Sequence, residues 1–270
     1  IELSRKTAHT GGNATCQKKA VCDECGDEYG KLGEHRYDAV VTPATCTKDG
    51  YTTHTCSGCK DSYVDSETRK TGHKIVRGQC TECKKRYPNP FYDVPSSAYY
   101  YGPVMWAYYY TPQITVGTDE TTFSPDANCT REQVVTFLWR AAGAPAPKTN
   151  ACPFNDVSPK SYAYRAITWA AENGIAAGTG EGRFSPGNTV TRAEFVTFLW
   201  RFFGKPTPTN LTNPFSDNEK GMFYYNAVLW AAENGIAAGT GGGRFSPYDC
   251  CTRAQVVSFL SRSIAGDIYK

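Results

Sequence analysis

The chain has 270 residues, 40% of them hydrophobic, a formal net charge of +3 and 20% charged residues. This length is enough for two ordinary domains, and the hydrophobic fraction supports a real core. A nearly balanced charge without clustered Lys and Arg argues against a nucleic-acid-binding face.

No apolar run approaches the roughly 18 residues of a membrane-spanning helix, so we predict no membrane insertion. The chain begins Ile1-Glu2-Leu3, with neither an initiator Met nor a signal peptide. This beginning indicates a fragment of a longer protein, so its location must be inferred from other features.

Residues 1–87 are predicted to form a small, β-rich spacer region stapled by Cys and His. Few aliphatic residues occur here, so apolar burial alone can hardly fold it. Three Cys-x-x-Cys pairs lie in this segment, a spacing that lets two thiolates bind one tetrahedral metal ion. The pairs are Cys22/Cys25, Cys56/Cys59 and Cys80/Cys83.

Two of the pairs share a frame in which a Cys precedes the pair and a His follows it. We predict two structural zinc sites on this basis, the first formed by Cys16, Cys22, Cys25 and His35 and the second by Cys46, Cys56, Cys59 and His73. Cys80 and Cys83 are further candidate ligands that compete for His73. Disulfides, typical of extracellular proteins, are the alternative. A zinc ribbon that joins Cys56/Cys59 to Cys80/Cys83 is a competing ligand set.

The second frame also predicts a β-hairpin. Asp49-Gly50 marks a turn, residues 51–56 form a strand, and residues 62–65 return past the Cys pair. The sequences at 44–59 and 71–73 resemble small Cys-rich modules that occur in tandem in large surface proteins of gut Firmicutes. The resemblance implies a spacer or presentation role.

Three near-copies of one segment follow. Phe-Ser-Pro begins at Phe123, Phe184 and Phe245, 61 residues apart each time. A fixed period indicates one structural unit that is repeated and packed against itself, and three such units can close around an axis. Proline-rich joints separate the repeats, which we place at residues 88–147, 148–208 and 209–270.

The second helix of each repeat has the clearest signal. In repeat two, Phe195, Phe198 and Leu199 begin an apolar stripe at helical spacing that continues to Phe202 and Phe203. A Thr caps each of these helices, and Glu or Gln three residues later reaches back to the cap. The pairs are Thr130/Gln133, Thr191/Glu194 and Thr252/Gln255.

An Arg directly follows each capping Thr, at Arg131, Arg192 and Arg253. A cation at a helix N-terminus opposes the helix dipole, so helix stability does not explain it. An Arg beside free backbone N–H groups is suited to binding a carboxylate or phosphate. The alternative is an ion pair with an Asp at the start of a repeat: Asp93, Asp156 or Asp217.

Phe-x-Asp-Val, Trp-Ala-Ala-Glu-Asn-Gly-Ile, Phe-Ser-Pro and Thr-Arg-Ala-Glu occur in series, and residues 90–265 therefore resemble three S-layer homology domains. The resemblance implies a mainly α fold of helix–loop–helix repeats, arranged as a pseudo-threefold trimer within one chain and thus a monomer. It also implies non-covalent binding of secondary cell wall polysaccharide, often pyruvylated, in grooves between repeats. The implied binding residues are Arg131, Arg192, Arg253, Asp93, Asp156, Asp217, Gly117, Gly178 and Gly239.

The repeats depart from the family pattern in places. Repeat one has two extra residues between Trp106 and Gly117, so its groove is the one least expected to bind. Tyr99, Tyr162 and Phe223 stand where the family commonly has Trp. Cys129 and Cys251, before the capping Thr, are predicted to be small buried thiols.

We therefore expect a non-catalytic anchor that attaches a bacterial surface protein to an acidic wall polysaccharide, outside a Gram-positive-type cell. The alternative is the C-terminal part of a surface hydrolase or adhesin whose Cys-rich region binds a partner. All four His precede residue 74, so the repeats lack His for acid–base catalysis. No nucleic-acid partner is expected.

Overall fold

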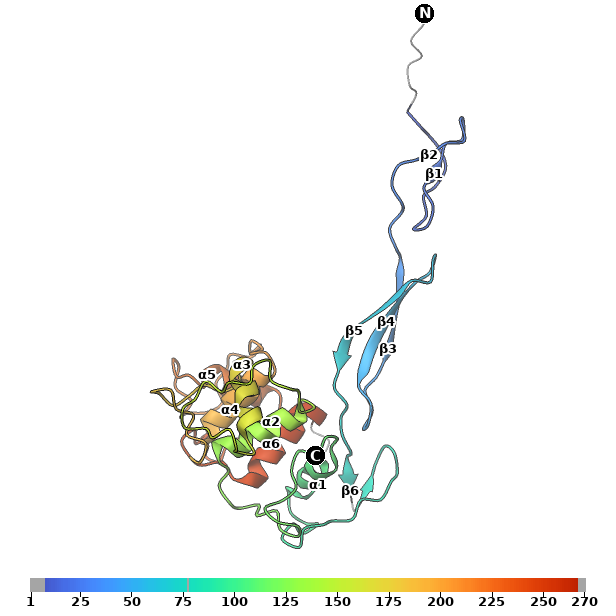
Figure 1. Cartoon of the computed structure of the whole chain (residues 1–270). Coiled ribbons are helices and arrows are strands. Elements are labelled where there is room, and N and C mark those ends of the chain that lie inside the picture. Colours follow the sequence, from blue (N-terminus) through green and yellow to red (C-terminus); the bar gives the residue numbers. More distant parts are fainter. Residues whose placement is uncertain (1–7, 77, 267–270) are drawn as a thin grey trace, which may run out of the picture. The chain divides into compact units, whose positions relative to one another are not determined.

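The computed structural model describes residues 8–76 and 78–266. The chain forms two compact units, residues 1–70 and 71–270. The first unit contains strands β1 to β5, and the second contains β6, β7 and helices α1 to α6 (Figure 1). The second unit begins before residue 88 because Trp106 Nε1 donates a hydrogen bond to the Thr71 carbonyl at 2.7 Å and β6 contacts α1.

The first unit consists of a short two-stranded ribbon and a three-stranded antiparallel meander in the order β3-β4-β5. The strands are β1 (Ala20–Val21), β2 (Glu28–Tyr29), β3 (Tyr37–Thr42), β4 (Gly50–Cys56) and β5 (Ser62–Thr68). The β4–β5 pair confirms the hairpin predicted from the sequence. β3 is an additional strand, and it pairs along the other edge of β4.

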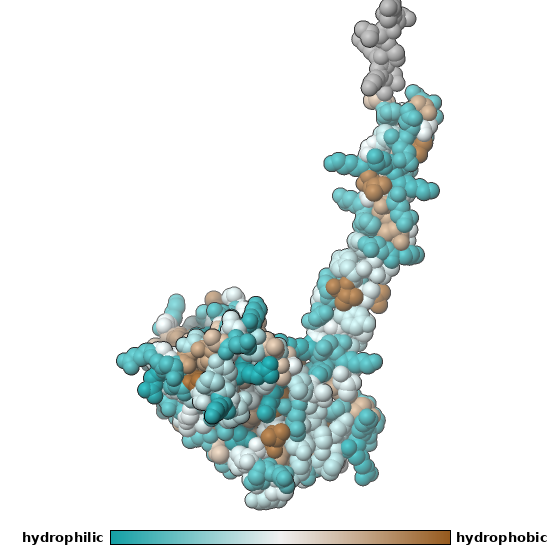
Figure 2. Space-filling view, viewed as in Figure 1, coloured by the Kyte–Doolittle hydropathy of each residue, from teal (hydrophilic) through white to brown (hydrophobic). Residues whose placement is uncertain are grey.

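Hydrophobic burial in the first unit is slight. Its buried hydrophobic residues are Ala20, Cys22, Cys46 and Cys56, whereas Val40 and Val41 of β3 are exposed. In Figure 2 hydrophilic residues cover most of the visible surface of this unit, and hydrophobic ones form separate small patches. Three of the four buried groups are thiols, so packing alone provides little to hold the strands together.

Over the described residues, the second unit contains six short helices, two in each repeat. The first helices of the three repeats are α1 (Tyr101–Tyr109), α3 (Tyr164–Glu172) and α5 (Tyr225–Glu233). The second helices are α2 (Arg131–Ala141), α4 (Arg192–Phe202) and α6 (Arg253–Ala265). A two-stranded ribbon, β6 (Ile75–Val76) and β7 (Gln79–Cys80), precedes them. None of the helices in the described ranges has both the length and the apolarity needed to cross a bilayer.

The repeats close into a ring. α3 packs on α2, α5 on α4 and α1 on α6, so each first helix contacts the second helix of the preceding repeat. The segments before the second helices are hydrogen-bonded in a cycle: Cys129 N–H donates to the Cys251 carbonyl, Cys251 to Val190, and Val190 to Cys129, each at 2.9 Å. This cycle forms a pseudo-threefold axis and confirms the mainly α fold of three helix–loop–helix repeats.

Cys129 and Cys251 lie fully buried at this axis, as expected of small apolar thiols. Burial raises the pKa of both thiols to about 12, which keeps them neutral and unreactive.

The structure confirms the capping pairs and the apolar stripe predicted for the second helices. All three have the reciprocal capping box, with the Thr side chain accepting from the N3 backbone N–H and the N3 side chain accepting from the cap N–H. Phe195, Phe198 and Leu199 are buried, so the apolar stripe faces the core. The stripe weakens at the end of the helix, where Phe203 is the C-cap and 36% exposed.

Candidate functional site

The three Cys-x-x-Cys pairs form the same turn. In each, the backbone N–H of the first Cys donates to a carbonyl five residues later, at 2.9, 2.8 and 2.9 Å for Cys22, Cys56 and Cys80. A residue with positive φ closes each turn: Gly26 (77°), Lys60 (66°) and Lys84 (61°). Each turn holds its pair of thiols near one point, as a knuckle that binds a metal ion requires.

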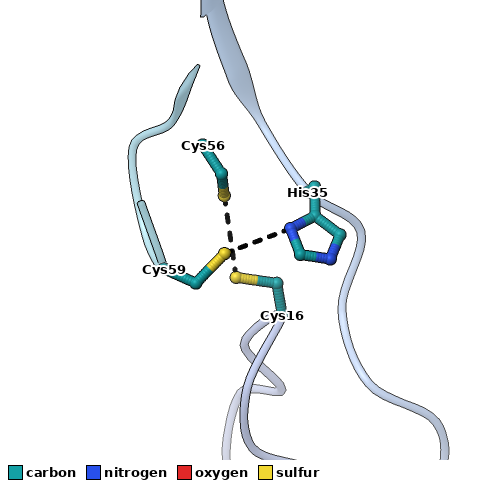
Figure 3. A group of neighbouring side chains, drawn as sticks. All are labelled: Cys16, His35, Cys56 and Cys59. Carbon is teal, nitrogen blue, oxygen red and sulfur yellow. Dashed lines mark hydrogen bonds between the residues drawn. The ribbon is translucent and has the colours of Figure 1, made fainter. Parts of the chain in front are cut away.

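The most complete group within one unit is Cys16, His35, Cys56 and Cys59, whose side chains converge (Figure 3). Their ligand atoms all lie within 4.8 Å of one another. The Cys16 and Cys56 sulfurs are 3.7 Å apart, and Cys59 Sγ is 3.3 Å from His35 Nδ1. Two thiolates on a tetrahedral zinc with bonds of about 2.3 Å have their sulfurs about 3.8 Å apart. A disulfide would need about 2.05 Å, so this geometry fits a metal ion and not a disulfide.

Strand pairing brings these four residues together. In the β3–β4 register Tyr37 lies opposite Cys56, and Ser57 N–H donates to the Arg36 carbonyl at 3.0 Å. His35, just before β3, therefore reaches the knuckle at the end of β4. A backbone hydrogen bond from Cys59 lowers the pKa of Cys56 to about 6, so its thiolate is favoured near neutral pH.

The other two knuckles also have a His beside them. His9 Nδ1 lies 3.4 Å from Cys25 Sγ, in a group with Cys22. In the second unit, His73 Nδ1 lies 3.6 Å from Cys83 Sγ, in a group with Cys80. His9 was not among the ligands predicted from the sequence. Its signal was the order along the chain, because each knuckle has a His upstream.

The structure corrects the predicted grouping of the ligands. Cys16 and His35 do not share a group with Cys22 and Cys25, and His73 does not share one with Cys56 and Cys59. The sequence frames assumed that each knuckle uses the His that follows it. The β3–β4 pairing instead gives the knuckle at Cys56 the preceding His35. Cys46 is buried, and its role as a ligand stays a prediction.

The three arginines that follow the capping Thr residues link neighbouring repeats. Each is 3% exposed, and its Nε donates at 2.9 Å to the Phe carbonyl of another repeat's Phe-Ser-Pro loop. The pairs are Arg131 with Phe184, Arg192 with Phe245 and Arg253 with Phe123. Each guanidinium also lies over two Phe rings, for Arg131 those of Phe184 and Phe198. The arginines therefore have a structural role, and polysaccharide binding by them stays a prediction.

The Asp residues near the start of each repeat bind backbone instead of these arginines. Asp156 accepts hydrogen bonds from the N–H groups of Phe184 and Ser185 at 2.7 and 2.8 Å, and Asp93 and Asp217 do the same in their repeats. The alternative ion pair with the helix arginine is therefore wrong for Arg131, which pairs with Glu194 at 2.8 Å. Burial opposes ionisation, but the two backbone hydrogen bonds outweigh it and hold the pKa of Asp156 below its ordinary value of 3.8.

We expect Asp156→Ala to lower the free energy of unfolding by about 1–3 kcal/mol, because two buried N–H groups lose their acceptor. Urea denaturation followed by helical circular dichroism measures this loss. Lys160→Ala changes an exposed residue of the same repeat and is the control. Equal stability of the two variants would contradict the role given to Asp156.

The loops beside the arginines are close-packed. A Cβ at Gly178 would lie 2.5 Å from the Arg183 carbonyl oxygen, and Gly239 is equally confined by Arg244. Gly117 has φ of +87° in the longer loop of repeat one. Glycine is therefore required at all three positions by the backbone, and ligand binding by them stays a prediction. Three aromatic side chains at equivalent positions are exposed: Tyr99, Tyr162 and Phe223.

Comparison with known families matches the S-layer homology domain at residues 90–135, 153–196 and 214–257. Among curated relatives, an endoglucanase of Bacillus sp. (strain KSM-635) is 34% identical over 43% of this chain and 12% of its own length. A cellulosome-anchoring protein of Acetivibrio thermocellus is 27% identical over 53% of this chain and 33% of its own length. An S-layer protein of Bacillus thuringiensis subsp. finitimus is 29% identical over 40% of this chain and 13% of its own length. The chain thus matches a minor part of each relative.

Proposed function

The chain carries three S-layer homology domains between residues 90 and 257, and from this premise we propose that it anchors a surface protein non-covalently to the bacterial cell wall. The ligand we propose is an acidic secondary cell wall polysaccharide, pyruvylated sugars included, bound in the grooves between repeats. Relatives named as an S-layer protein and a cellulosome-anchoring protein support a location outside the cell, at the wall.

One observation carries this proposal: a buried guanidinium meets a neighbouring repeat's Phe-Ser-Pro loop three times around one axis, and Arg253 lines a cavity together with the exposed Tyr162. A guanidinium binds carboxylates well because its planar fork donates two parallel hydrogen bonds. The exposed aromatic rings, of which Tyr162 is 61% accessible, offer flat apolar faces for a sugar ring. Several grooves on one chain also suit a polymer, since several weak contacts add up to strong attachment.

We propose no catalytic step for this chain. The endoglucanase relative matches over 12% of its length, so the likeness lies in one segment of that enzyme. The described repeats bring together no group of His, Cys and carboxylates that resembles a catalytic centre. The anchor therefore holds in place whatever activity the rest of such a protein has.

We also propose that the metal ion of the Cys and His groups is zinc, in a structural role. Three thiols and one imidazole at Cys16, His35, Cys56 and Cys59 form a closed four-ligand set. Such sets are typical of structural zinc, whereas a catalytic zinc keeps one position open for water.

Sedimentation with cell walls tests the anchoring function. The full 270-residue chain should sediment with purified walls of the parent bacterium. It should remain in solution with walls from which the acidic polymer has been extracted. Equal sedimentation with both wall preparations, or with neither, would refute binding to the acidic polysaccharide.

A further inference from the structure

In repeats two and three, the last residue of the first helix holds the segment that enters the repeat. Glu172 ends α3, and its carboxylate accepts hydrogen bonds from the backbone N–H groups of Lys148 and Thr149 at 2.8 and 2.7 Å. Glu233 ends α5 and accepts in the same way from two consecutive N–H groups, at residues 209 and 210. In both repeats the segment held is the proline-rich joint.

Repeat one has a tyrosine at this position. Tyr109 ends α1, and its hydroxyl donates to the Pro88 carbonyl at 2.7 Å. Its ring packs edge-on against that of Tyr87, with the ring centres 4.6 Å apart. The segment that enters repeat one comes from the last Cys-x-x-Cys knuckle, so α1 holds the knuckle where α3 and α5 hold a joint.

Tyr87 lies between α1 and the Cys and His group of this knuckle, which contains His73, Cys80 and Cys83. The ring centres of Tyr87 and His73 are 4.5 Å apart, and the Tyr87 hydroxyl is nearer to Nε2 than to Nδ1, at 3.0 and 3.3 Å. His73 Nδ1 lies 3.6 Å from Cys83 Sγ. In metal sites a group that holds the second ring nitrogen fixes the orientation of the His ligand. Tyr87 is placed for this role, and it also contacts Tyr109.

The backbone beside His73 packs against the same helix. The Thr71 carbonyl accepts from Trp106 Nε1 at 2.7 Å. A Cβ at Gly72 would collide with Trp106 Nε1 and lie 2.8 Å from Tyr110 Cδ2, so the chain runs directly against the two rings. Strand β6 contacts α1 as well (Figure 1). The knuckle and α1 therefore share contacts on both sides of His73.

This knuckle is too small to keep its shape by pairing alone. β6 and β7 have two residues each, and an isolated two-stranded hairpin is at best marginally stable in water. Cys80 is fully buried beside Ile75, which is 1% exposed. In small modules of this kind the free energy of metal binding is in effect folding free energy.

We propose that the metal ion of His73, Cys80 and Cys83 is a structural component of the repeat unit, and that its binding holds α1 in place. This assignment rests on the zinc binding proposed above. The metal ion fixes His73 and the adjoining backbone, which in turn fixes Trp106. Because α1 also packs on α6, the metal ion contributes to closure of the ring at repeat one. The anchoring unit accordingly begins at this metal site.

Amide hydrogen exchange of the full chain tests the proposal. Cys80→Ser should remove one metal ion per chain and speed exchange of the α1 amides by about tenfold, since local stability sets the exchange rate. The equivalent helices α3 and α5 are internal controls and should exchange as in the wild type. Cys56→Ser is the matched control variant, because it removes a ligand from the group in the first unit and should leave α1 protected. Zinc added to EDTA-treated wild-type protein should restore α1 protection.

The coupling must also act in the reverse direction, because linked binding free energies are reciprocal. Tyr109→Ala removes the contact with Tyr87 and should weaken zinc binding at one site by about tenfold, the size of effect seen when the support of a metal ligand is lost. Competition with a chromophoric chelator measures this affinity. Glu172→Ala changes the equivalent residue of repeat two and should leave every zinc affinity unchanged.

Three results would overturn the coupling and leave zinc binding standing. They are wild-type α1 exchange in Cys80→Ser protein that has lost one metal ion, equal loss of protection in α1, α3 and α5, and α1 exchange that rises as much in Cys56→Ser as in Cys80→Ser. Wild-type protein without any bound metal would overturn both the coupling and the zinc proposal.

Discussion

Chelation of the full-length chain is expected to unfold the strands of residues 8–70 and leave helices α2, α4 and α6 intact. Three of the four buried hydrophobic residues of the first unit are cysteines, and its valines are exposed, so a bound metal ion would provide most of the stability that packing does not. In small modules of this kind the metal-binding free energy, about 10–16 kcal/mol for zinc in peptides at neutral pH, is in effect folding free energy. Elemental analysis before chelation should find zinc in stoichiometric amounts.

Backbone amide spectra recorded before and after EDTA treatment measure this unfolding of the strands. Signals from β3 to β5 should collapse to unfolded positions, and added zinc should restore them. Cys16→Ser should have the same effect on the meander without chelator. Cys250→Ser is the matched control, because Cys250 is an exposed thiol outside the metal groups. Unchanged β4 signals in both EDTA-treated protein and Cys16→Ser would show that no metal holds this unit.

Arg131→Ala is expected to destabilise the repeats by about 3 kcal/mol, the low end of the cost of breaking a buried ion pair, because Arg131 is buried but the Glu194 side chain is 27% accessible. The substitution removes the partner of Glu194 and leaves the Phe184 and Ala177 carbonyls without a donor. It also removes the guanidinium from its position 4.8 Å from the Phe184 ring centre. Because these contacts join repeats one and two, the loss weakens closure of the ring and not only one helix.

The three arginine variants should lose stability in the order of the hydrogen bonds they lose, which among the described residues are three for Arg131, two for Arg192 and one for Arg253. Arg131→Ala should be the least stable, Arg192→Ala intermediate and Arg253→Ala the mildest, as judged by urea denaturation followed by tryptophan fluorescence. Glu194→Gln is a matched control, since its side-chain oxygen can still cap Thr191 while the ion pair is lost. Glu194→Gln should lower the free energy of unfolding less than Arg131→Ala does. The reverse order among the arginines would contradict the account of their contacts.

Several features of the second unit were predictable from the sequence because they depend on local patterns. The 61-residue period, the apolar stripe at Phe195, Phe198 and Leu199, and the capping pairs each involve residues a few positions apart. A capping box is formed by neighbours along one turn, so sequence spacing determines it. The thiols at Cys129 and Cys251 were identified as buried by comparison with Val190 at the equivalent position.

The partners of the arginines could not be predicted from the sequence, because they lie far away along the chain. The guanidinium of Arg131 meets Glu194, 63 residues away, and that of Arg253 meets the Phe123 carbonyl, 130 residues away. Nothing in the spacing of Thr-Arg-x-Glu shows that the arginine lies inward and crosses to another repeat. Ring closure decides this, because it places each second helix against a neighbouring loop.

In the Cys-rich region, too, some features were predictable from the sequence and others depended on the tertiary structure. Sequence by itself identified the three Cys-x-x-Cys pairs and their tight turns, because Cys-x-x-Cys is a local signal, but it did not identify His9. Only the tertiary structure decided that Cys16 and His35 join Cys56 and Cys59. The reason is the antiparallel register that sets Tyr37 opposite Cys56, a pairing between strands whose side chains alternate and which no local spacing specifies.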